Sequence, residues 1–173
     1  ANEVLNEFDR LVLKYTILAN CTGDRDAAYG EISKALEIEP NDPELLSDRA
    51  ALSIQLNKFD IAKQDLMLLL ENESLKNDKV YLNALISMGL INQEEHNYTE
   101  ALMNYDKVTK YKSEFPFTVA RAHFNKHKVK LLLNDESYLD ELEKAISYDP
   151  NDPIFYLARA YYLKGNPVNF NRV

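Results

Sequence analysis

Two histidines, His123 and His127, have the spacing with the clearest capacity for metal chemistry, because residues four apart lie on one face of a helix. The stretch reads His-Phe-Asn-Lys-His, so the glutamate that metalloproteases place directly after the first histidine is missing. Lys126 lies between the two histidines and would repel a cation. We therefore expect a structural or surface role for both, and neither a metal nor any other cofactor.

The remaining reactive side chains also point away from catalysis. Carboxylate pairs such as Glu94-Glu95 and Asp140-Glu141 are ordinary on an acidic helical surface, and nothing marks one carboxylate as a general acid. The single cysteine, Cys21, is expected to be a half-buried small residue at a helix end. The sequence contains no nucleophile elbow, phosphate loop or Cys/His cluster. It therefore predicts a protein that is not an enzyme.

Basic residues gather in segment 107–130, where Glu114 is the one acid among Lys107, Lys110, Lys112, Arg121, Lys126, Lys128 and Lys130. The chain as a whole has a net charge of −8, so we expect mainly a solvated face that balances the acidic remainder. An acidic partner segment, or an acidic surface of another copy, is the alternative. Nucleic acid is disfavoured because arginine is sparse and no nucleic-acid-reading motif accompanies the segment.

A repeated tetrapeptide organises the elements that carry these residues. It reads Pro-Asn-Asp-Pro at 40–43 and again at 150–153. The first proline cannot continue a helix, the aspartate is a good N-cap, and the second proline suits the first position of a new helix. Each copy therefore predicts a tight junction between two helices. Looser junctions are expected near 72–81, with Asp78 as an N-cap, and near 113–118.

Apolar residues recur at spacings of three and four along the whole chain, and no segment alternates with period two. This pattern predicts an all-α protein with about nine helices in antiparallel pairs. The first is expected over about residues 3–20, and the others run through about 28–39, 45–56, 61–70, 80–91, 101–108, 119–133, 139–146 and 154–164.

The spacing of small residues resembles the tetratricopeptide repeat (TPR) family, whose helix–turn–helix unit has 34 residues. Ala28 and Ala62 are 34 residues apart, and Ala101 follows 39 residues later. These match the alanine at the family's twentieth position, which Tyr138 replaces in the fourth unit. The small residue of the eighth position is matched by Ala50, Gly89, Ala122 and Ala160, with Thr16 as a departure.

The resemblance implies a right-handed superhelical array of helix pairs, a TPR-like α-solenoid that forms a single domain over residues 1–173. Its units are expected at about 9–42, 43–76, 82–115 and 115–152, followed by an unpaired helix at 153–165 and an irregular tail at 166–173. The unpaired helix is either a solvating cap or the mark of a truncated chain.

In this family, the first helix of each pair (helix A) lines a concave groove that binds partners. The resemblance therefore implies contact residues at the exposed helix-A positions, which are Lys14, Ile17, Asp48, Ala51, Gln55, Ser87, Leu90, Glu94, His123, Lys126, His127 and Tyr161. Solvated groove walls, or packing between neighbouring A helices, are the alternative.

Some family members bind the C-terminal carboxylate of a chaperone with a clamp of Lys, Asn and Arg side chains. The matching positions here are Leu13, Ile17, Asp48, Asn83 and Ser87, so the clamp is absent. Asp48 would also repel a carboxylate. Binding of a chaperone tail is therefore disfavoured.

The favoured hypothesis is a non-enzymatic scaffold that binds a peptide or protein segment in the concave groove. The alternatives are a self-association module acting through residues 153–165, and an accessory domain of an enzyme or ion-binding protein. No apolar run approaches the ~20 residues that cross a bilayer. We expect a soluble protein, either cytoplasmic or, with an upstream signal removed, periplasmic or otherwise extracytoplasmic.

Overall fold

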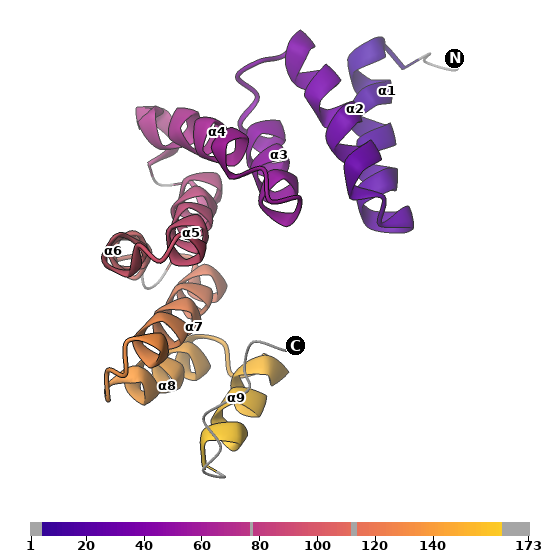
Figure 1. Cartoon of the computed structure of the whole chain (residues 1–173). Helices are drawn as coiled ribbons and strands as arrows, with labels where there is room; N and C mark the ends of the chain where they lie inside the picture. Colours follow the sequence, from indigo (N-terminus) through magenta and orange to yellow (C-terminus); the bar gives the residue numbers. More distant parts are fainter. Residues whose placement is uncertain (1–4, 77, 112–113, 164–173) are drawn as a thin grey trace. The chain divides into compact units, whose positions relative to one another are not determined.

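The computed structural model describes residues 5–76, 78–111 and 114–163, and the regular elements of these residues are all helices (Figure 1). An all-α fold with about nine helices is thereby confirmed for this part of the chain. The predicted irregular tail at 166–173 lies outside the described residues. The α-helices are α1 (Glu7–Ile17), α2 (Arg25–Ile38), α3 (Pro43–Gln55), α4 (Phe59–Glu71), α5 (Lys79–Glu94), α6 (Tyr98–Val108), α7 (Pro116–Leu132), α8 (Tyr138–Tyr148) and α9 (Pro153–Leu163).

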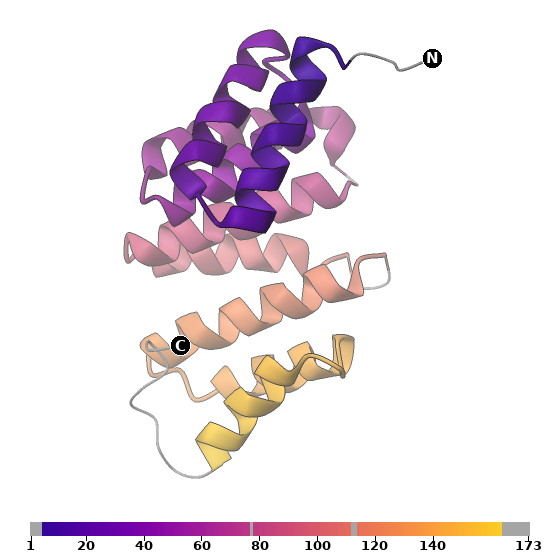
Figure 2. The ribbon, with the colours of Figure 1, turned by 90° about the vertical axis from the view of Figure 1, so that its right-hand side faces the viewer.

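The chain divides into two compact units, Ala1–Ile91 and Asn92–Val173, and α5 crosses the boundary between them. In the first unit α1 packs against α2, α2 against α3, and α3 against α4. In the second unit α7 packs against α6 and α8, and α8 packs against α9. Figure 2 shows α1 beside α2 in the first unit and α8 beside α9 in the second. The single domain over 1–173 stays a prediction.

The Pro-Asn-Asp-Pro junctions begin new helices in the expected way. Asp42 is the N-cap of α3 and accepts a hydrogen bond from the Leu45 amide at 2.9 Å, with Pro43 at the first helical position. Asp152 accepts one from the Ile154 amide at 2.8 Å as α9 begins. Of the looser junctions, the one before α5 holds a 3-10 turn, η2 (Glu73–Leu75), and the one before α7 is described only in part.

The turns that follow α1, α3, α5 and α7 share a left-handed residue. Gly23 (φ 70°) follows a π-helical turn, η1 (Leu18–Thr22), and Asn57 (φ 57°), His96 (φ 63°) and Asn134 (φ 54°) stand at the same place in the later pairs. This conformation ends a helix and lets the chain reverse; glycine adopts it without strain, and asparagine and histidine adopt it more readily than most residues.

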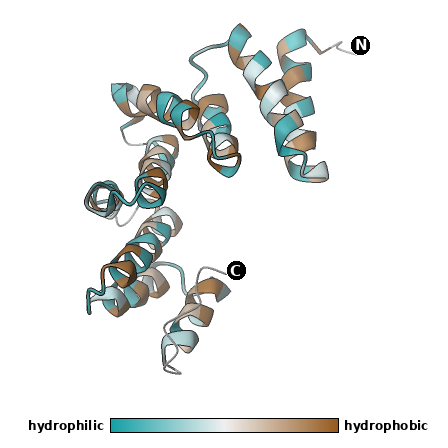
Figure 3. Ribbon diagram, viewed as in Figure 1, coloured by the Kyte–Doolittle hydropathy of each residue, from teal (hydrophilic) through white to brown (hydrophobic). Residues whose placement is uncertain are grey.

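The helices carry both hydrophobic and hydrophilic residues (Figure 3), as amphipathic packing requires. The core of the first unit joins Ile32 of α2, Leu45 of α3 and Leu66 of α4, all at most 4% exposed. A core cluster of the second unit joins Ala120 of α7, Leu142 of α8 and Phe155 of α9.

Small residues at the repeat positions let the helices approach closely. Ala28, Ala62 and Ala101 are fully buried, as are Ala50 and Ala122. Ala160 is exposed, because no helix among the described residues covers that side of α9.

Candidate interaction surface

The A helices of the first unit are tied to each other by side chains. The hydroxyl of Tyr15, on α1, donates a hydrogen bond to the Asp48 carboxylate, on α3. Burial, together with the Asp48 carboxylate, raises the pKa of the Tyr15 hydroxyl, so the phenol stays protonated and remains the donor. Asp48, predicted as a contact residue, is therefore exposed on a face shared by α1 and α3.

Large apolar side chains are exposed elsewhere on α1, two residues before and two residues after Tyr15. Leu13 is 50% exposed and Ile17 is 46% exposed. The side chain of Lys14, next to Leu13 in the sequence, is largely exposed, and its ammonium group donates to Glu31 of α2 at 2.8 Å. Exposed aliphatic side chains are not needed on a helix surface that faces only water. On α1 they provide apolar contact area beside the ammonium group of Lys14.

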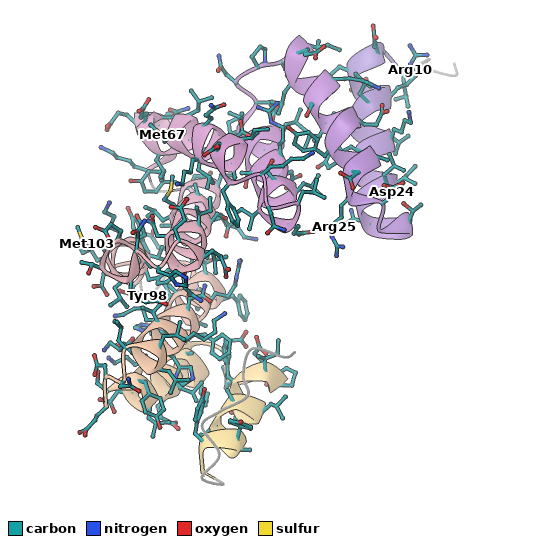
Figure 4. All side chains as sticks on the ribbon, viewed as in Figure 1. Arg10, Asp24, Arg25, Met67, Tyr98 and Met103 are labelled. Atoms are coloured by element: carbon teal, nitrogen blue, oxygen red, sulfur yellow. The ribbon has the colours of Figure 1, made fainter. Side chains whose placement is uncertain are left out.

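The predicted contact residues of α3 continue the face by one helical turn each. Ala51 and Gln55 follow Asp48 at intervals of three and four, and all three are exposed. Gln55 accepts a hydrogen bond at 2.6 Å from Nε of Arg25, which reaches it from the start of α2 (Figure 4). On α5, Ser87 and Leu90 are half-buried.

In the second unit, the predicted residues of α7 form an internal network around Glu141 of α8, which is 3% exposed. The Nδ1–H of His123 donates to Glu141 at 2.7 Å. The ammonium groups of Lys126 and Lys130 both lie 3.3 Å from its carboxylate, and Lys144 lies at 3.2 Å. Burial by itself would raise the pKa of Glu141, but the His123 hydrogen bond and the lysine charges hold it well below its usual range.

His127 is buried one helical turn beyond His123, with 0% of its surface exposed. Its Nδ1–H donates to the Tyr138 carbonyl at 2.8 Å, and Nε2 has no hydrogen-bond partner. The rings of Phe124, Tyr138 and Tyr162 surround it at centroid distances of 5.1–5.8 Å. Burial lowers the pKa of His127, so the ring is a neutral structural group.

The structure thus places His123, Lys126 and His127 between helices, where the sequence register expected exposed groove positions. The α7 stripe that carries them faces α8, because Glu141 and the Tyr138 carbonyl satisfy their polar atoms there. Lys126 also pairs with Asp106 of α6 at 2.7 Å. Of the second-unit residues predicted to contact a partner, Glu94 is exposed and Tyr161 is half-buried.

The basic segment 107–130 is partly neutralised in the same way. Lys126 and Lys130 pair with acids, while burial lowers the pKa of Lys128, which lies over the Phe124 ring at 5.4 Å. Lys107, Lys110 and Arg121 are exposed, and Lys112 lies outside the described residues. Within the described ranges, no three His, Cys, Asp or Glu side chains gather as a metal site, and Cys21 is exposed.

Sequence reasoning missed a repeated acid–base pair. In three of the helix–turn–helix repeats, a buried carboxylate on the second helix (helix B) pairs with bases from the first helix (helix A). These are Glu31 with Lys14, Asp65 with Arg49, and Glu141 with the α7 bases. The signal was present, because each acid stands three residues after the position that holds Ala28, Ala62 or Tyr138. In the third repeat, the residue three positions after Ala101 is Asn104, which is not an acid.

Comparison with known proteins fits this architecture. No family model matches the chain, and no curated protein matches it. A solved structure of PilF from Pseudomonas aeruginosa, a TPR-containing protein, is similar with a TM-score of 0.72 at 20% sequence identity, over 91% of this chain and 68% of that one. The chain has a TPR-like helical repeat fold. In the part that the structure describes, no helix combines the length and apolar character needed to cross a membrane.

Proposed function

We propose that the protein is a non-enzymatic scaffold that binds a peptide or protein segment on the helix-A face of its first unit. The binding surface comprises Leu13, Lys14, Ile17, Asp48, Ala51 and Gln55, with Ser87 and Leu90 of α5 at its side. The observation that carries the proposal is the exposure of Leu13 and Ile17, one turn apart on α1, a helix that the Tyr15–Asp48 hydrogen bond ties to α3. A surface that is already ordered costs less entropy to bind.

The chemistry of this surface defines the partner class. Leu13 and Ile17 favour apolar side chains, and the exposed Asp48 carboxylate disfavours a terminal carboxylate nearby. The partner is therefore an internal segment with aliphatic or aromatic anchors, and its binding does not require a free C-terminus. A chaperone tail held by its carboxylate does not meet this requirement.

A displayed peptide library selected on the wild-type chain tests the proposal. Selected peptides are then titrated against Ile17→Asp and against Met67→Asp, a matched control. Met67 is 51% exposed on the outer side of α4, in the same unit (Figure 4). We expect Ile17→Asp to weaken binding at least tenfold and Met67→Asp to leave it unchanged, with equal affinity for amidated and free peptide ends. Peptides that bind equally well to both variants would refute the proposed surface.

Self-association through residues 153–165 stays a prediction. The exposed Ile154 and Leu157 of α9 favour some partner for that helix. Sedimentation of the wild-type chain at high concentration, compared with Leu157→Asp, measures this directly.

A further inference from the structure

The last described helix, α9, repeats the sequence position of α3. Both begin at the second proline of a Pro-Asn-Asp-Pro junction, so each residue of α3 corresponds to the residue 110 places later in α9. The correspondence holds in the packing as well. Leu45 of α3 is 4% exposed and its counterpart Phe155 of α9 is 2% exposed, each in the core of its own unit.

One face of α3 is covered by its helix B, α4. Arg49 lies on this face and donates from Nε and Nη2 to the two carboxylate oxygens of Asp65 at 2.8 and 2.6 Å. Leu46, one turn earlier, is 3% exposed, and Ala50 is fully buried. On α4 the matching residues are Ala62, fully buried, and Asp65 three positions later. An Ala-x-x-Asp pattern thus covers an Arg-Ala pair.

The corresponding face of α9 has the same residue types, and no helix among the described residues covers it. Arg159 takes the place of Arg49, and Ala160 takes the place of Ala50. Ala160 is exposed, and Tyr156, at the position of Leu46, is 38% exposed. Arg159 lies over the Tyr156 ring at 5.1 Å and contacts Glu143 at 3.4 Å, a pair in which the glutamate side chain is 55% exposed. Such an exposed, single contact is weak compared with the bidentate pair of α3.

The outer positions of α9 are also more apolar than those of α3. Where α3 has Glu44 and Ser47, α9 has Ile154 and Leu157, which are 54% and 62% exposed. Leu157 and Tyr156 stand three and four residues before Ala160 and so flank it, and Ile154 stands one turn before Leu157. Exposed apolar side chains beside a charged residue are typical of a protein-binding face.

We propose that this face of α9 binds an amphipathic helix of another protein that carries a small residue and, three positions later, an aspartate or glutamate. The small residue packs on Ala160, the carboxylate pairs with Arg159, and flanking apolar residues cover Tyr156 and Leu157. The proposal is independent of the surface proposed on the first unit.

Two sources within this chain fit the requirement poorly. Residues 164–173 contain neither aspartate nor glutamate, so they do not supply a side-chain carboxylate. The chain's own Ala-x-x-acid helices are α2 and α4, and their acids are buried in pairs of their own, with Glu31 8% and Asp65 1% exposed. A second folded copy therefore does not present one.

A peptide of residues 58–72, the α4 sequence of this chain, serves as the probe helix. Isolated helices of this length are marginal, so a staple joins positions 60 and 64, which are exposed in α4. Binding of the labelled peptide to the full 173-residue chain is followed by fluorescence anisotropy. We expect saturable binding that weakens at least tenfold when the peptide carries Asp65→Asn, or when the chain carries Arg159→Glu or Ala160→Leu.

A charge-reversed pair distinguishes binding of the peptide to α9 from binding to α3, against which α4 packs in this chain. A peptide with Asp65→Arg is expected to regain binding to the Arg159→Glu chain. Arg121→Glu, which changes an exposed arginine of the same unit, should leave binding unchanged, and circular dichroism verifies that each variant is folded. The proposal is overturned if the stapled peptide fails to bind, if Arg159→Glu binds it as tightly as the wild type, or if Leu157→Asp dissociates a homodimer formed by the wild-type chain.

Discussion

Arg49 and Asp65 join the two helices of one repeat through a bidentate ion pair, in which both carboxylate oxygens accept hydrogen bonds from one guanidinium. The Asp65 side chain is 2% exposed and that of Arg49 is 22% exposed, so the pair lies at the edge of the core. Asp65 raises the pKa of Arg49. The same arrangement, a helix-B acid with helix-A bases, recurs at Glu31 and Glu141, which indicates that it helps to fix helix register within each pair.

Removal of one member of this pair should be costly. Asp65→Ala leaves the guanidinium of Arg49 without its acceptors, and we expect the free energy of unfolding to fall by about 2–4 kcal/mol. Urea denaturation followed by circular dichroism measures the change. The exposed Lys76–Glu73 pair provides the control, since Glu73→Ala should cost no more than about 0.5 kcal/mol. If the free energy of unfolding falls equally in the two variants, the buried pair contributes no more to stability than an exposed one.

Glu141 should make the second unit sensitive to acid. Its pKa in the folded state lies below the ordinary value of 4.5. The unfolded chain therefore binds the proton more readily, and the stabilisation, complete above pH 4.5, is lost as the pH falls from there through the folded-state pKa. In Glu141→Gln this acid-dependent loss should be smaller, and stability at pH 7 should already be lower by about 3 kcal/mol. Thermal unfolding at pH 7, 5 and 3 gives both quantities; parallel pH profiles for variant and wild type would contradict the assignment.

The helix boundaries and the small-residue positions could be predicted from the sequence, because they depend on local chemistry. Proline, N-cap aspartate and left-handed turn residues act within a few positions of themselves, and Ala28 and Ala62 are spaced by the repeat. The role of His123 could not be predicted in this way. Its partner Glu141 is 18 residues away on another helix, and the rotation of α7 that turns His123 inward depends on packing.

His127 should add a second, separate pH dependence. Burial lowers its pKa below the ordinary 6.5, so at pH values under 6.5 the unfolded chain takes up a proton that the folded chain does not. Stability of the second unit should therefore begin to fall as the pH drops below 6.5, before Glu141 titrates. In His127→Phe the slope between pH 7 and 5 should flatten, whereas His96→Phe, which alters an exposed histidine, should keep it. An unchanged slope in His127→Phe would mean that another group titrates in this window.

Asn134 tests the contribution of the left-handed turns. It connects α7 to α8 at φ 54°, a conformation in which a β-branched side chain meets its own backbone. Asn134→Val should lower the free energy of unfolding by about 1–2 kcal/mol, whereas Asn134→Gly should change it by less than about 1 kcal/mol because glycine adopts this conformation without strain. Glu136→Val, at an exposed position in the same connection, controls for the added apolar surface. The turn holds the last backbone hydrogen bonds of α7 in place, so amide hydrogen exchange at Leu133 and Asn134 should accelerate in Asn134→Val alone. Equal exchange in all three variants would show that the turn forms regardless of the residue that occupies it.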